Sequence, residues 1–271
     1  MGEVYLREDF AGRWQHSDPF EEVERLSTAP VRAVARRRTF RFELDGRGYY
    51  AKVHEGVGWR EIIKNLLVGK APVIDAGNEY RAARRLTEKG IATLRVAAFG
   101  TRGSNPARLQ SFLVTDEIVG ATTLEDLTLA WPQEPPALAF KRQLINAVAD
   151  LAREMHAAGV NHRDFYLCHL MLRGKQSGER ELLVMDLHRA QIRDRVPRRW
   201  LVRDLAGLHY SSLDIGLSTT DVYRFLSRYY QLPLREVFTD HGELLAAVAR
   251  RAQRLYQKAQ RKGILPGQAR G

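Results

Sequence analysis

The sequence has a single cysteine and no long apolar run, and both shortages restrict what the protein can be. One thiol, Cys168, cannot build a disulfide framework or a cysteine-based zinc site, and it fits a reducing cytosol. No apolar stretch approaches the roughly 18 to 20 residues that a membrane span needs, and the opening residues MGEVYLREDF do not resemble a signal peptide. We therefore expect a soluble protein, whose 44% hydrophobic residues suffice for a sizeable core.

Acidic residues are in the minority. The 271 residues include 43 lysines and arginines against 32 aspartates and glutamates, and only 8 of the basic residues are lysines. Arginine pairs well with phosphates and carboxylates, so the net charge of +11 indicates nucleotide phosphates, nucleic acid, an anionic lipid or an acidic protein as partner. A GC-rich genome explains the same excess equally well. Nucleic acid is not expected, because the stacking aromatics of single-strand binders and any zinc or basic-zipper pattern are absent.

The chain divides into a strand-rich part and a helix-rich part, without internal repeats or long linkers. The first part has a predicted hairpin, two helices and two strands, at 39–53, 60–68, 78–89, 92–99 and 111–118. The second part has predicted helices and two strand-like segments, at 139–158, 201–215, 220–230 and 243–262, and at 170–172 and 182–185. This order predicts an α+β fold with two lobes, residues 1–118 and 119–271, and a ligand cleft where the lobes meet.

One segment carries the strongest chemical signal. The tripeptide His162-Arg163-Asp164 follows a predicted helix, and Asp186 follows an apolar strand about twenty residues later, which is the catalytic arrangement of protein kinases. Phosphoryl transfer needs one carboxylate to accept the proton of the attacking hydroxyl and another to hold magnesium against the phosphates. We predict Asp164 in the first role and Asp186 in the second, with His162 and Arg163 beside Asp164 as further catalytic residues. The alternative is that both aspartates cap turns and that Arg163 is a surface charge.

Three further residues fit the same arrangement in the same chain order. Lys52 lies on the second strand of the hairpin, where a kinase places the lysine that grips the α- and β-phosphates of ATP, and Glu79 opens the following helix as its partner. Asp204 matches the helix aspartate that braces the catalytic loop. The alternatives are solvated side chains for Lys52 and Glu79, and a helix N-cap for Asp204.

Three longer strings extend the kinase pattern: EGVGWREIIKN at 55–65, NHRDFYLCH at 161–169 and DLHRAQ at 186–191. With them the chain resembles, over nearly its whole length, the lipopolysaccharide core heptose kinases of the WaaP type, within the protein-kinase-like superfamily. The resemblance implies an ATP- and Mg²⁺-dependent enzyme that phosphorylates the first heptose of the lipopolysaccharide inner core. It implies a place at the cytoplasmic face of the inner membrane of a Gram-negative bacterium. It also implies that ATP is held between lobes meeting near 117–120, with adenine at the backbone of Asp116 and Ile118.

The sequence departs from protein kinases around the phosphates and the metal. No glycine-rich phosphate loop precedes the lysine strand, so Arg37 and Arg38, within 35–39, are predicted to cradle the phosphates; a basic strand edge in water is the alternative. His169 stands where a kinase has a metal-binding asparagine. Imidazole suits magnesium poorly, so we expect Asp186, water and phosphate oxygens to dominate coordination, with His169 as a weak ligand, a phosphate contact or a support for Asp164. His188 replaces the glycine after the metal aspartate, which disfavours a flipping activation switch.

Basic residues on two segments are candidates for binding an anionic acceptor. These residues are Arg60 and Lys64 in the first segment, and Arg189, Arg193, Arg195, Arg198 and Arg199 in the second. Solvated basic loops are the alternative. The helix at 243–262 has an apolar stripe beside many basic residues; packing on the second lobe is favoured over lying on an anionic membrane surface. The same basic surface could recruit an acidic protein such as an acyl carrier protein.

Two rival functions remain open at this point. A kinase of Kdo, or of another small molecule such as an aminoglycoside, would use the same groups. A catalytically silent pseudokinase scaffold is the alternative outside the enzymes, and the unusual His169 keeps it open, although Lys52, Asp164 and Asp186 are all retained.

Overall fold

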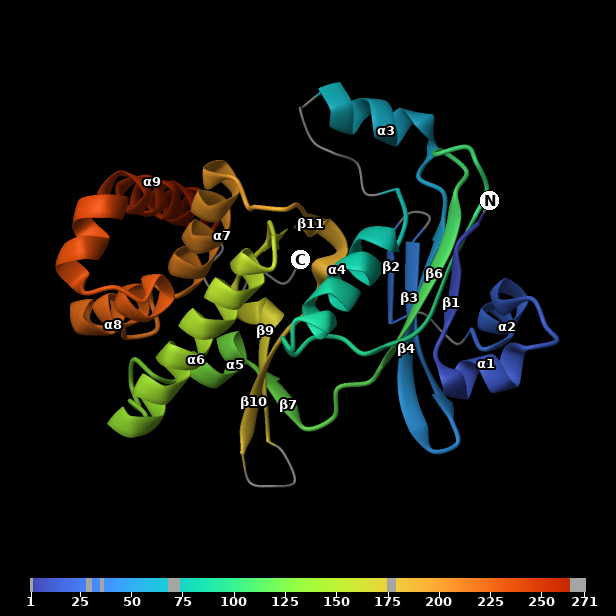
Figure 1. The fold of residues 1–271 in the computed structure, drawn as a ribbon, viewed down its shortest axis with the longest axis horizontal. Coiled ribbons are helices and arrows are strands. Elements are labelled where there is room, and N and C mark those ends of the chain that lie inside the picture. Colours follow the sequence, from blue (N-terminus) through green and yellow to red (C-terminus); the bar gives the residue numbers. More distant parts are fainter. Residues whose placement is uncertain (1, 28–30, 35–36, 68–73, 175–178, 264–271) are drawn as a thin grey trace. The chain divides into compact units, whose positions relative to one another are not determined.

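The computed structural model describes residues 2–27, 31–34, 37–67, 74–174 and 179–263. The chain forms two compact units, shown with their elements in Figure 1. The N-terminal unit comprises Met1–Arg84, Leu94–Val119 and Leu187–Arg189, and the C-terminal unit comprises Arg85–Thr93, Gly120–Asp186 and Ala190–Gly271. Helices and strands are both abundant, so the α+β class is confirmed. The boundary between residues 118 and 119 stays a prediction, because each unit also takes a short segment from the other side of it.

The N-terminal unit is built on a six-stranded antiparallel sheet in the order β1-β5-β6-β4-β3-β2. Its strands are β1 (Val4–Leu6), β2 (Arg32–Val34), β3 (Arg37–Leu44), β4 (Arg47–Glu55), β5 (Val96–Arg102) and β6 (Gln110–Asp116). The helices of this unit are α1 (Glu8–Trp14), α2 (Pro19–Arg25), α3 (Gly58–Leu67) and α4 (Gly77–Glu88), of which α4 has its last turn in the C-terminal unit. The strand predicted at 92–99 begins only at Val96, since Thr93 forms an isolated parallel bridge with Val184 in the other unit's core.

The predicted hairpin is confirmed as β3 and β4. Asp45 and Gly46 form its turn, with φ of 50° and 70°. Two successive left-handed residues are typical of a type I′ turn, whose twist matches that of the flanking strands. The turn therefore fixes the register in which Thr39 lies opposite Lys52.

Alternation along the strands separates two faces of the sheet. One face carries Phe40, Phe42 and Ala51, which pack into a core with Phe10 and Trp14 of α1. The opposite face is covered by α4, through a second core of Ala76, Tyr80, Phe99 and Leu113. Lys52 lies opposite Leu113 in the register of β4 and β6, so it belongs to the face that α4 covers.

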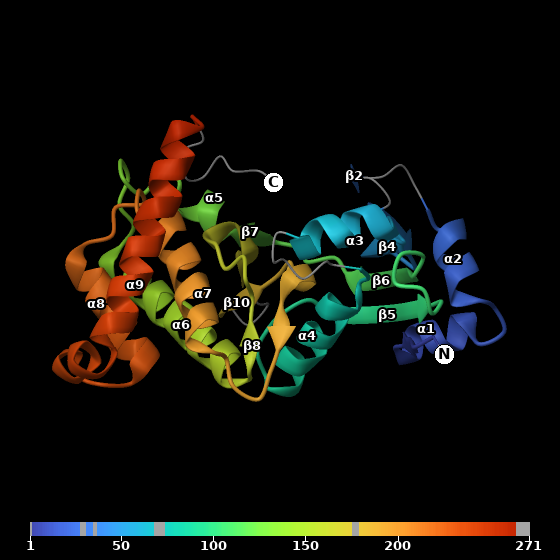
Figure 2. The same ribbon diagram turned by 90° about the horizontal axis from the view of Figure 1, so that it is seen from above.

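The C-terminal unit is mostly helical. It contains α5 (Leu124–Thr128), α6 (Leu138–Ala157), α7 (Arg198–Ser211), α8 (Thr219–Tyr230) and α9 (Leu234–Arg261). Two small antiparallel sheets complete it, from β7 (Ala121–Thr123), β9 (Leu170–Gly174) and β10 (Arg180–Val184), and from β8 (Val160–Asn161) and β11 (Gln191–Ile192). In Figure 2, α7 lies beside α9, and α6 contacts α8.

The last helix begins earlier than predicted, and it packs on the C-terminal unit, which was the favoured alternative. Gln231 ends α8 with φ of 55°, and α9 starts at Leu234, directly after Pro233, rather than at residue 243. Its residues Leu244, Val248 and Ala252 are buried, and α9 lies along α7. The apolar stripe therefore serves the core of this unit and does not lie on a membrane. Among the helices described, none is long and apolar enough to cross a membrane.

Candidate active site

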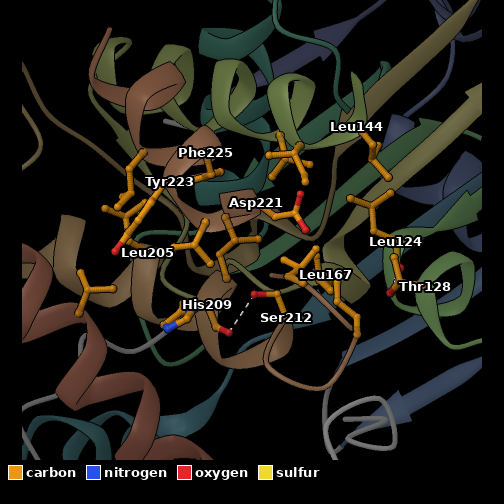
Figure 3. A pocket seen from close by; sticks show the side chains of 18 of the residues that line it. Leu124, Thr128, Leu144, Leu167, Leu205, His209, Ser212, Asp221, Tyr223 and Phe225 are labelled. Atoms are coloured by element: carbon orange, nitrogen blue, oxygen red, sulfur yellow. Dashed lines mark hydrogen bonds between the residues drawn. The ribbon is translucent and has the colours of Figure 1, made fainter. Parts of the chain in front are cut away.

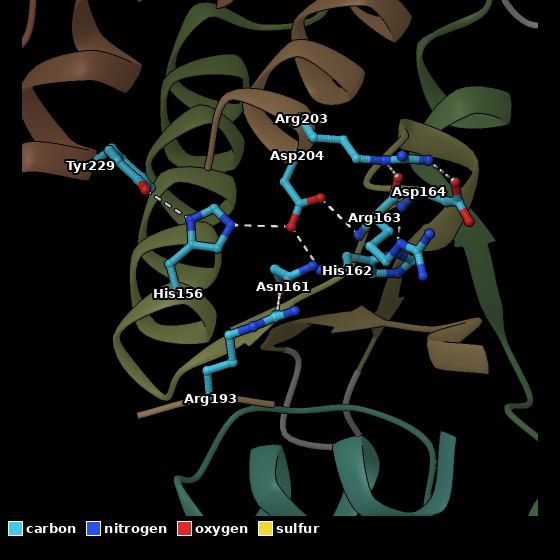
Figure 4. A network of polar contacts seen from close by, with 9 residues as sticks. All are labelled: His156, Asn161, His162, Arg163, Asp164, Arg193, Arg203, Asp204 and Tyr229. Carbon is cyan, nitrogen blue, oxygen red and sulfur yellow. Dashed lines mark hydrogen bonds and ion pairs between the residues drawn. The ribbon is translucent and has the colours of Figure 1, made fainter. Parts of the chain in front are cut away.

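The predicted catalytic loop follows β8 and is held by a buried carboxylate. Asp204 accepts hydrogen bonds from the backbone N–H groups of His162 and Arg163, each 2.7 Å long (Figure 4). Arg163 has φ of 74°, a left-handed conformation that costs energy for a residue with a side chain. Asp204 lies inside α7, whose N-cap is Pro197, so the N-cap alternative for Asp204 is wrong. The carboxylate from α7 therefore stabilises a strained turn of the loop.

Two residues that the sequence analysis missed extend this network into the helical core. The Nε2 atom of His156 on α6 lies 3.4 Å from Asp204, and its Nδ1 atom lies 2.8 Å from the hydroxyl of Tyr229 on α8. Burial raises the pKa of Tyr229, so the hydroxyl keeps its proton and donates to Nδ1. The Nε2–H group of His156 then donates to Asp204. Three helices thus contribute to holding one carboxylate.

His162 is fully buried and links the catalytic loop to the segment before Asp186. Its Nε2 atom lies 2.8 Å from the backbone oxygen of Met185, and its Nδ1 atom lies 3.3 Å from the backbone nitrogen of Asp164. Burial lowers the pKa of His162, which favours the neutral ring. In that ring Nε2–H donates to Met185 and Nδ1 accepts from Asp164. These contacts position the loop that carries Asp164, and a catalytic role of His162 stays a prediction.

His169 joins the two predicted catalytic carboxylate segments. Its Nδ1 atom lies 2.7 Å from the backbone oxygen of Asp164, and its Nε2 atom lies 3.5 Å from Oδ2 of Asp186. Because a carbonyl oxygen only accepts, Nδ1 carries a proton and donates to Asp164. Asp186 itself has a left-handed φ of 60°, a second strained position in the same unit. The contacts of His169 therefore connect Asp164 with Asp186 within the C-terminal unit.

The donor set around Asp186 suits a cation that takes most of its ligands elsewhere. Among the described residues, no group of three or more histidine, cysteine or acidic side chains could hold a metal ion. The carboxylate of Asp186 is a hard oxygen donor of the kind that Mg²⁺ prefers, whereas the Nε2 atom of His169 is a poor ligand for it. The coordination of Mg²⁺ by Asp186, water and phosphate oxygens stays a prediction.

Arg203, one residue before Asp204, is a further support that sequence reasoning missed. Its Nε donates to the backbone oxygen of Arg163 at 2.7 Å, and its Nη2 lies 3.6 Å from Oδ1 of Asp164. The guanidinium of Arg163 is buried and lies 5.2 Å from the centre of the Trp200 ring, so the surface-charge alternative for Arg163 is wrong. Arg203 and Asp204 follow Trp200 on α7 by three and four residues. That helical spacing is the signal that could have identified them together.

The predicted phosphate-binding pair forms within the N-terminal unit. The Nζ atom of Lys52 on β4 lies 2.5 Å from Oε1 of Glu79 on α4. The side chain of Glu79 is 1% exposed and that of Lys52 is 19% exposed, so the solvated-residue alternative is wrong for both. A buried glutamate thus holds the lysine on the face of the sheet that α4 covers.

The two predicted cradle arginines lie on opposite faces of β3. Arg37 is opposite His54 in the register of β3 and β4, on the same face as Lys52. Arg38 is opposite Val53, and its guanidinium pairs with Glu24 of α2 and lies 3.7 Å from Glu55. Since side chains alternate along a strand, Arg38 is directed away from the Lys52 face. The prediction for Arg38 is therefore corrected, whereas residues 35 and 36 lie outside the described part of the chain.

The predicted adenine contacts are at the end of β6. The backbone N–H of Asp116 donates to the oxygen of Arg95 at 3.0 Å, and the Asp116 carboxylate binds Arg7 at 2.9 Å. Ile118 is half-buried. The role of Asp116 and Ile118 in binding adenine stays a prediction.

The basic candidates for the acceptor differ in their surroundings. Arg60, Lys64, Arg195 and Arg198 are exposed, and Arg198 lies 3.3 Å from Glu243. Arg189 is half-buried in the N-terminal unit. Arg193 and Arg199 instead lie over the Trp200 ring, and Arg193 also donates to Asn161 at 2.6 Å. The acceptor-binding role of all seven basic residues stays a prediction.

An apolar cavity of about 280 Å³ lies inside the C-terminal unit (Figure 3). Helices α5 to α9 line it with side chains such as Leu124, Leu144, Leu205 and Phe225. Its acidic group, Asp221, is paired with Lys141 at 2.7 Å. This cavity was not predicted from the sequence.

Comparison with known proteins decides the family. Residues 21–229 match the family model described as the lipopolysaccharide kinase (Kdo/WaaP) family. The chain belongs to this family. All the predicted site residues, from Arg37 to Asp204, lie within the matched region. The resemblance drawn from the three sequence strings is thereby confirmed.

Relatives within the Kdo/WaaP family cover almost the whole chain. A lipopolysaccharide core heptose(I) kinase WaaP of Pseudomonas aeruginosa is 48% identical over 265 residues, which are 97% of this chain and 99% of the relative. A protein of the same name from Escherichia coli is 43% identical over 96% of this chain and its own full length. A solved structure described as WaaP in complex with acyl carrier protein has a TM-score of 0.80 at 44% identity, covering 94% of this chain and 99% of that one. The similarity of that structure supports the protein-kinase-like two-lobed class.

Proposed function

We propose that this protein is a lipopolysaccharide core heptose(I) kinase, which transfers the γ-phosphoryl group of ATP to a hydroxyl of the first heptose of the inner core. The observation that carries the proposal is the near-complete match to heptose(I) kinases at 42–48% identity. The hydrogen bonds that hold Asp164 and its loop support it from the structure.

The chemistry assigns each group a task. Lys52, held by Glu79, binds the α- and β-phosphates of ATP, and the half-buried Arg37 on β3 adds positive charge on the same face. Asp164 orients the heptose hydroxyl and accepts its proton as the new bond to phosphorus forms. Asp186 supplies the carboxylate that holds Mg²⁺, which neutralises charge on the β- and γ-phosphates when bound. Asp204, His162 and His169 keep the two carboxylates in place.

The alternatives are less well supported. The family description includes Kdo kinases, but the three curated relatives that cover 96–97% of the chain are all named heptose(I) kinases. A pseudokinase scaffold would not need the buried Lys52–Glu79 contact together with Asp164 and Asp186. Both alternatives remain outcomes of the experiment below.

The test is transfer of labelled phosphate from ATP to purified core oligosaccharide. Asp164→Asn is expected to lower the rate at least a thousandfold with the melting temperature unchanged within about 3 °C. Asp194→Asn, an exposed aspartate of the same unit, is the matched control and is expected to retain full activity. Transfer that is unaffected in Asp164→Asn would contradict the base assignment, and a product labelled on Kdo would contradict the acceptor.

We also propose an acyl carrier protein as a partner of this chain. The net charge of +11 complements an acidic protein, and the similar solved structure is WaaP in a complex of this kind. The apolar cavity lined by Leu144 and Leu205 is chemically suited to an acyl chain delivered by such a partner.

Filling the cavity tests this partner. Leu144→Trp is expected to lower the affinity for an acyl carrier protein loaded with a hexadecanoyl chain at least tenfold, measured by calorimetry. Leu138→Trp, at the exposed start of the same helix, is the control and is expected to change it less than twofold. Equal binding by Leu144→Trp and the wild type would place the acyl chain elsewhere, whereas loss of binding to the unloaded carrier would indicate a damaged surface. A lipid-linked acceptor further supports a peripheral position at the cytoplasmic face of the inner membrane.

A further inference from the structure

Helix α3 exposes an unusual amount of apolar surface. Trp59, Ile63, Leu66 and Leu67 have exposed fractions of 54%, 51%, 60% and 81%. Ile62 is the buried residue of this helix among those whose side chains are described. Large apolar side chains gathered on one exposed element mark an interaction surface, whereas single exposed ones are ordinary.

The four apolar residues occupy one face of the helix. At about 100° per residue, positions 59, 63, 66 and 67 fall within an arc of about 100°, and Ile62 continues that arc toward the buried side. Arg60 and Lys64, both exposed, follow directly at the other edge of the arc. The helix therefore has an apolar face that adjoins a basic one, along the ten residues of Gly58–Leu67.

This combination fits an anionic lipid surface. A helix that lies in a membrane interface buries its apolar face about 5 to 10 Å deep and keeps basic side chains at the anionic headgroups. Tryptophan is favoured at this depth, because its ring is apolar and its N–H is polar. A second copy of the chain would satisfy the apolar face but would bring Arg60 and Lys64 close to the same residues of its partner.

We infer that α3 is the membrane-docking element of the protein, with Trp59, Ile63, Leu66 and Leu67 inserted among anionic lipids and with Arg60 and Lys64 at their headgroups. The choice of lipid as occupant rests on the proposed function, in which the acceptor is lipid-linked. Docking through α3 would hold the N-terminal unit at the surface that presents the acceptor. Arg60 and Lys64, which were predicted to bind the acceptor, would then bind the anionic lipid surface in which the acceptor is anchored.

Quenching by brominated lipids tests the insertion of Trp59 directly. Vesicles of 30% phosphatidylglycerol and 70% brominated phosphatidylcholine are expected to quench the protein's tryptophan fluorescence, and Trp59→Phe is expected to abolish this quenching while binding changes less than twofold. Trp14 and Trp131 are buried, and Trp200 is half-buried with arginine guanidinium groups against its ring, so Trp59 is the exposed tryptophan of the described residues. Quenching that persists in Trp59→Phe, or no quenching of the wild type, would overturn the inference.

Vesicle co-sedimentation tests the remaining face without ATP or acceptor. Ile63→Ser combined with Leu66→Ser is expected to weaken binding to the same vesicles, unbrominated, at least tenfold. Leu129→Ser, at the exposed leucine that follows α5 as its C-cap, is the matched control and is expected to weaken it less than twofold. Vesicles of phosphatidylcholine alone are expected to bind at least tenfold more weakly than the anionic ones. If the double variant binds the vesicles as tightly as the wild type, α3 does not dock on lipid. The same conclusion follows if the wild type self-associates without vesicles and the double variant does not, because the apolar face would then contact a second copy of the chain. A protein that binds vesicles but fails in phosphate transfer would instead contradict only the proposed function.

Discussion

The carboxylate of Asp204 holds the backbone of Arg163 in a left-handed conformation by accepting its N–H at 2.7 Å. The second oxygen of the same carboxylate accepts the N–H of His162, also at 2.7 Å. A residue with a side chain leaves the left-handed region readily unless its surroundings prevent it. The position of Asp164, the next residue, therefore depends on a carboxylate from a different helix.

The Asp204→Asn variant should distinguish the effect of this carboxylate on the catalytic loop from its effect on the stability of the whole protein. An amide keeps one acceptor oxygen but directs an NH₂ group at one of the two backbone N–H donors. We expect a loss of about 2 kcal/mol in the free energy of unfolding, because a buried donor loses its partner. The rate of phosphate transfer at saturating ATP should fall at least tenfold in protein that is still folded. Urea unfolding and steady-state kinetics measure the two effects. Wild-type activity in Asp204→Asn would show that the catalytic loop keeps its conformation without the carboxylate.

Gly207 lies at the point where α7 comes close to the backbone of Phe165 and the ring of Tyr166 in the catalytic loop. A Cβ atom at this position would lie 2.9 Å from the backbone oxygen of Phe165 and 3.2 Å from the ring of Tyr166. Gly207→Ala should therefore destabilise the protein by about 1 to 3 kcal/mol and displace the loop that carries Asp164.

Gly242 provides the matched control for this substitution. It lies inside α9, and a Cβ there meets no atom within 4 Å. Gly242→Ala should stabilise the protein by about 0.5 to 1 kcal/mol, since alanine favours a helix interior over glycine. Thermal unfolding of the two variants should thus shift in opposite directions. Equal shifts would contradict the close contact between α7 and the loop.

Some of this structure was predictable because its cause lies in neighbouring residues. The β3–β4 hairpin follows from alternation around Asp45 and Gly46, whose turn conformation is local. The helices α4 and α6 follow from apolar periodicity. In contrast, α1 and α2 have seven residues each and were not predicted, since such short helices depend on packing against the sheet.

The candidate site shows the same division. The kinase spacing identified Asp164, Asp186, Lys52 and Asp204, because a chemical task fixes both residue type and chain order. The roles of His156 and Tyr229 arise only from the packing of α6 against α8. The exclusion of Arg38 from the Lys52 face required the register of β3 against β4, which a one-residue shift would have reversed.

The buried pair of Lys52 and Glu79 predicts a defect in nucleotide binding. Glu79→Gln removes the charge that holds Lys52, while the amide oxygen still accepts a hydrogen bond. We expect the KM for ATP to rise about tenfold or more and stability to fall by about 2 kcal/mol, less than for a fully buried pair because Lys52 reaches water. Glu88→Gln, at the exposed end of the same helix, should change neither. Steady-state kinetics with varied ATP measures the difference, and an unchanged KM would remove Lys52 from the phosphate site.

His54 on β4 predicts how stability depends on pH. Burial, with smaller contributions from Arg37, Lys52 and His188, lowers the pKa of His54 to about 3 in the folded protein. An unfolded chain has an ordinary histidine pKa of about 6.5, so below that pH the unfolded state binds a proton that the folded state does not. Stability associated with His54 is therefore complete above pH 6.5 and is lost progressively as the pH falls toward 3. Between pH 7.5 and 4.5 this loss is about 2 to 3 kcal/mol.

Replacing His54 should flatten that dependence. His54→Gln and His54→Leu differ in size and polarity, and each will have its own stability at pH 7.5. Both remove the titrating group, so both should lose about 2 to 3 kcal/mol less than the wild type when the pH is lowered from 7.5 to 4.5. Urea unfolding at several pH values gives the three profiles. If the wild type and both variants lose the same free energy of unfolding over this pH range, His54 takes up its proton equally in the folded and unfolded states. The ring of His54 would then be exposed to water in the folded protein.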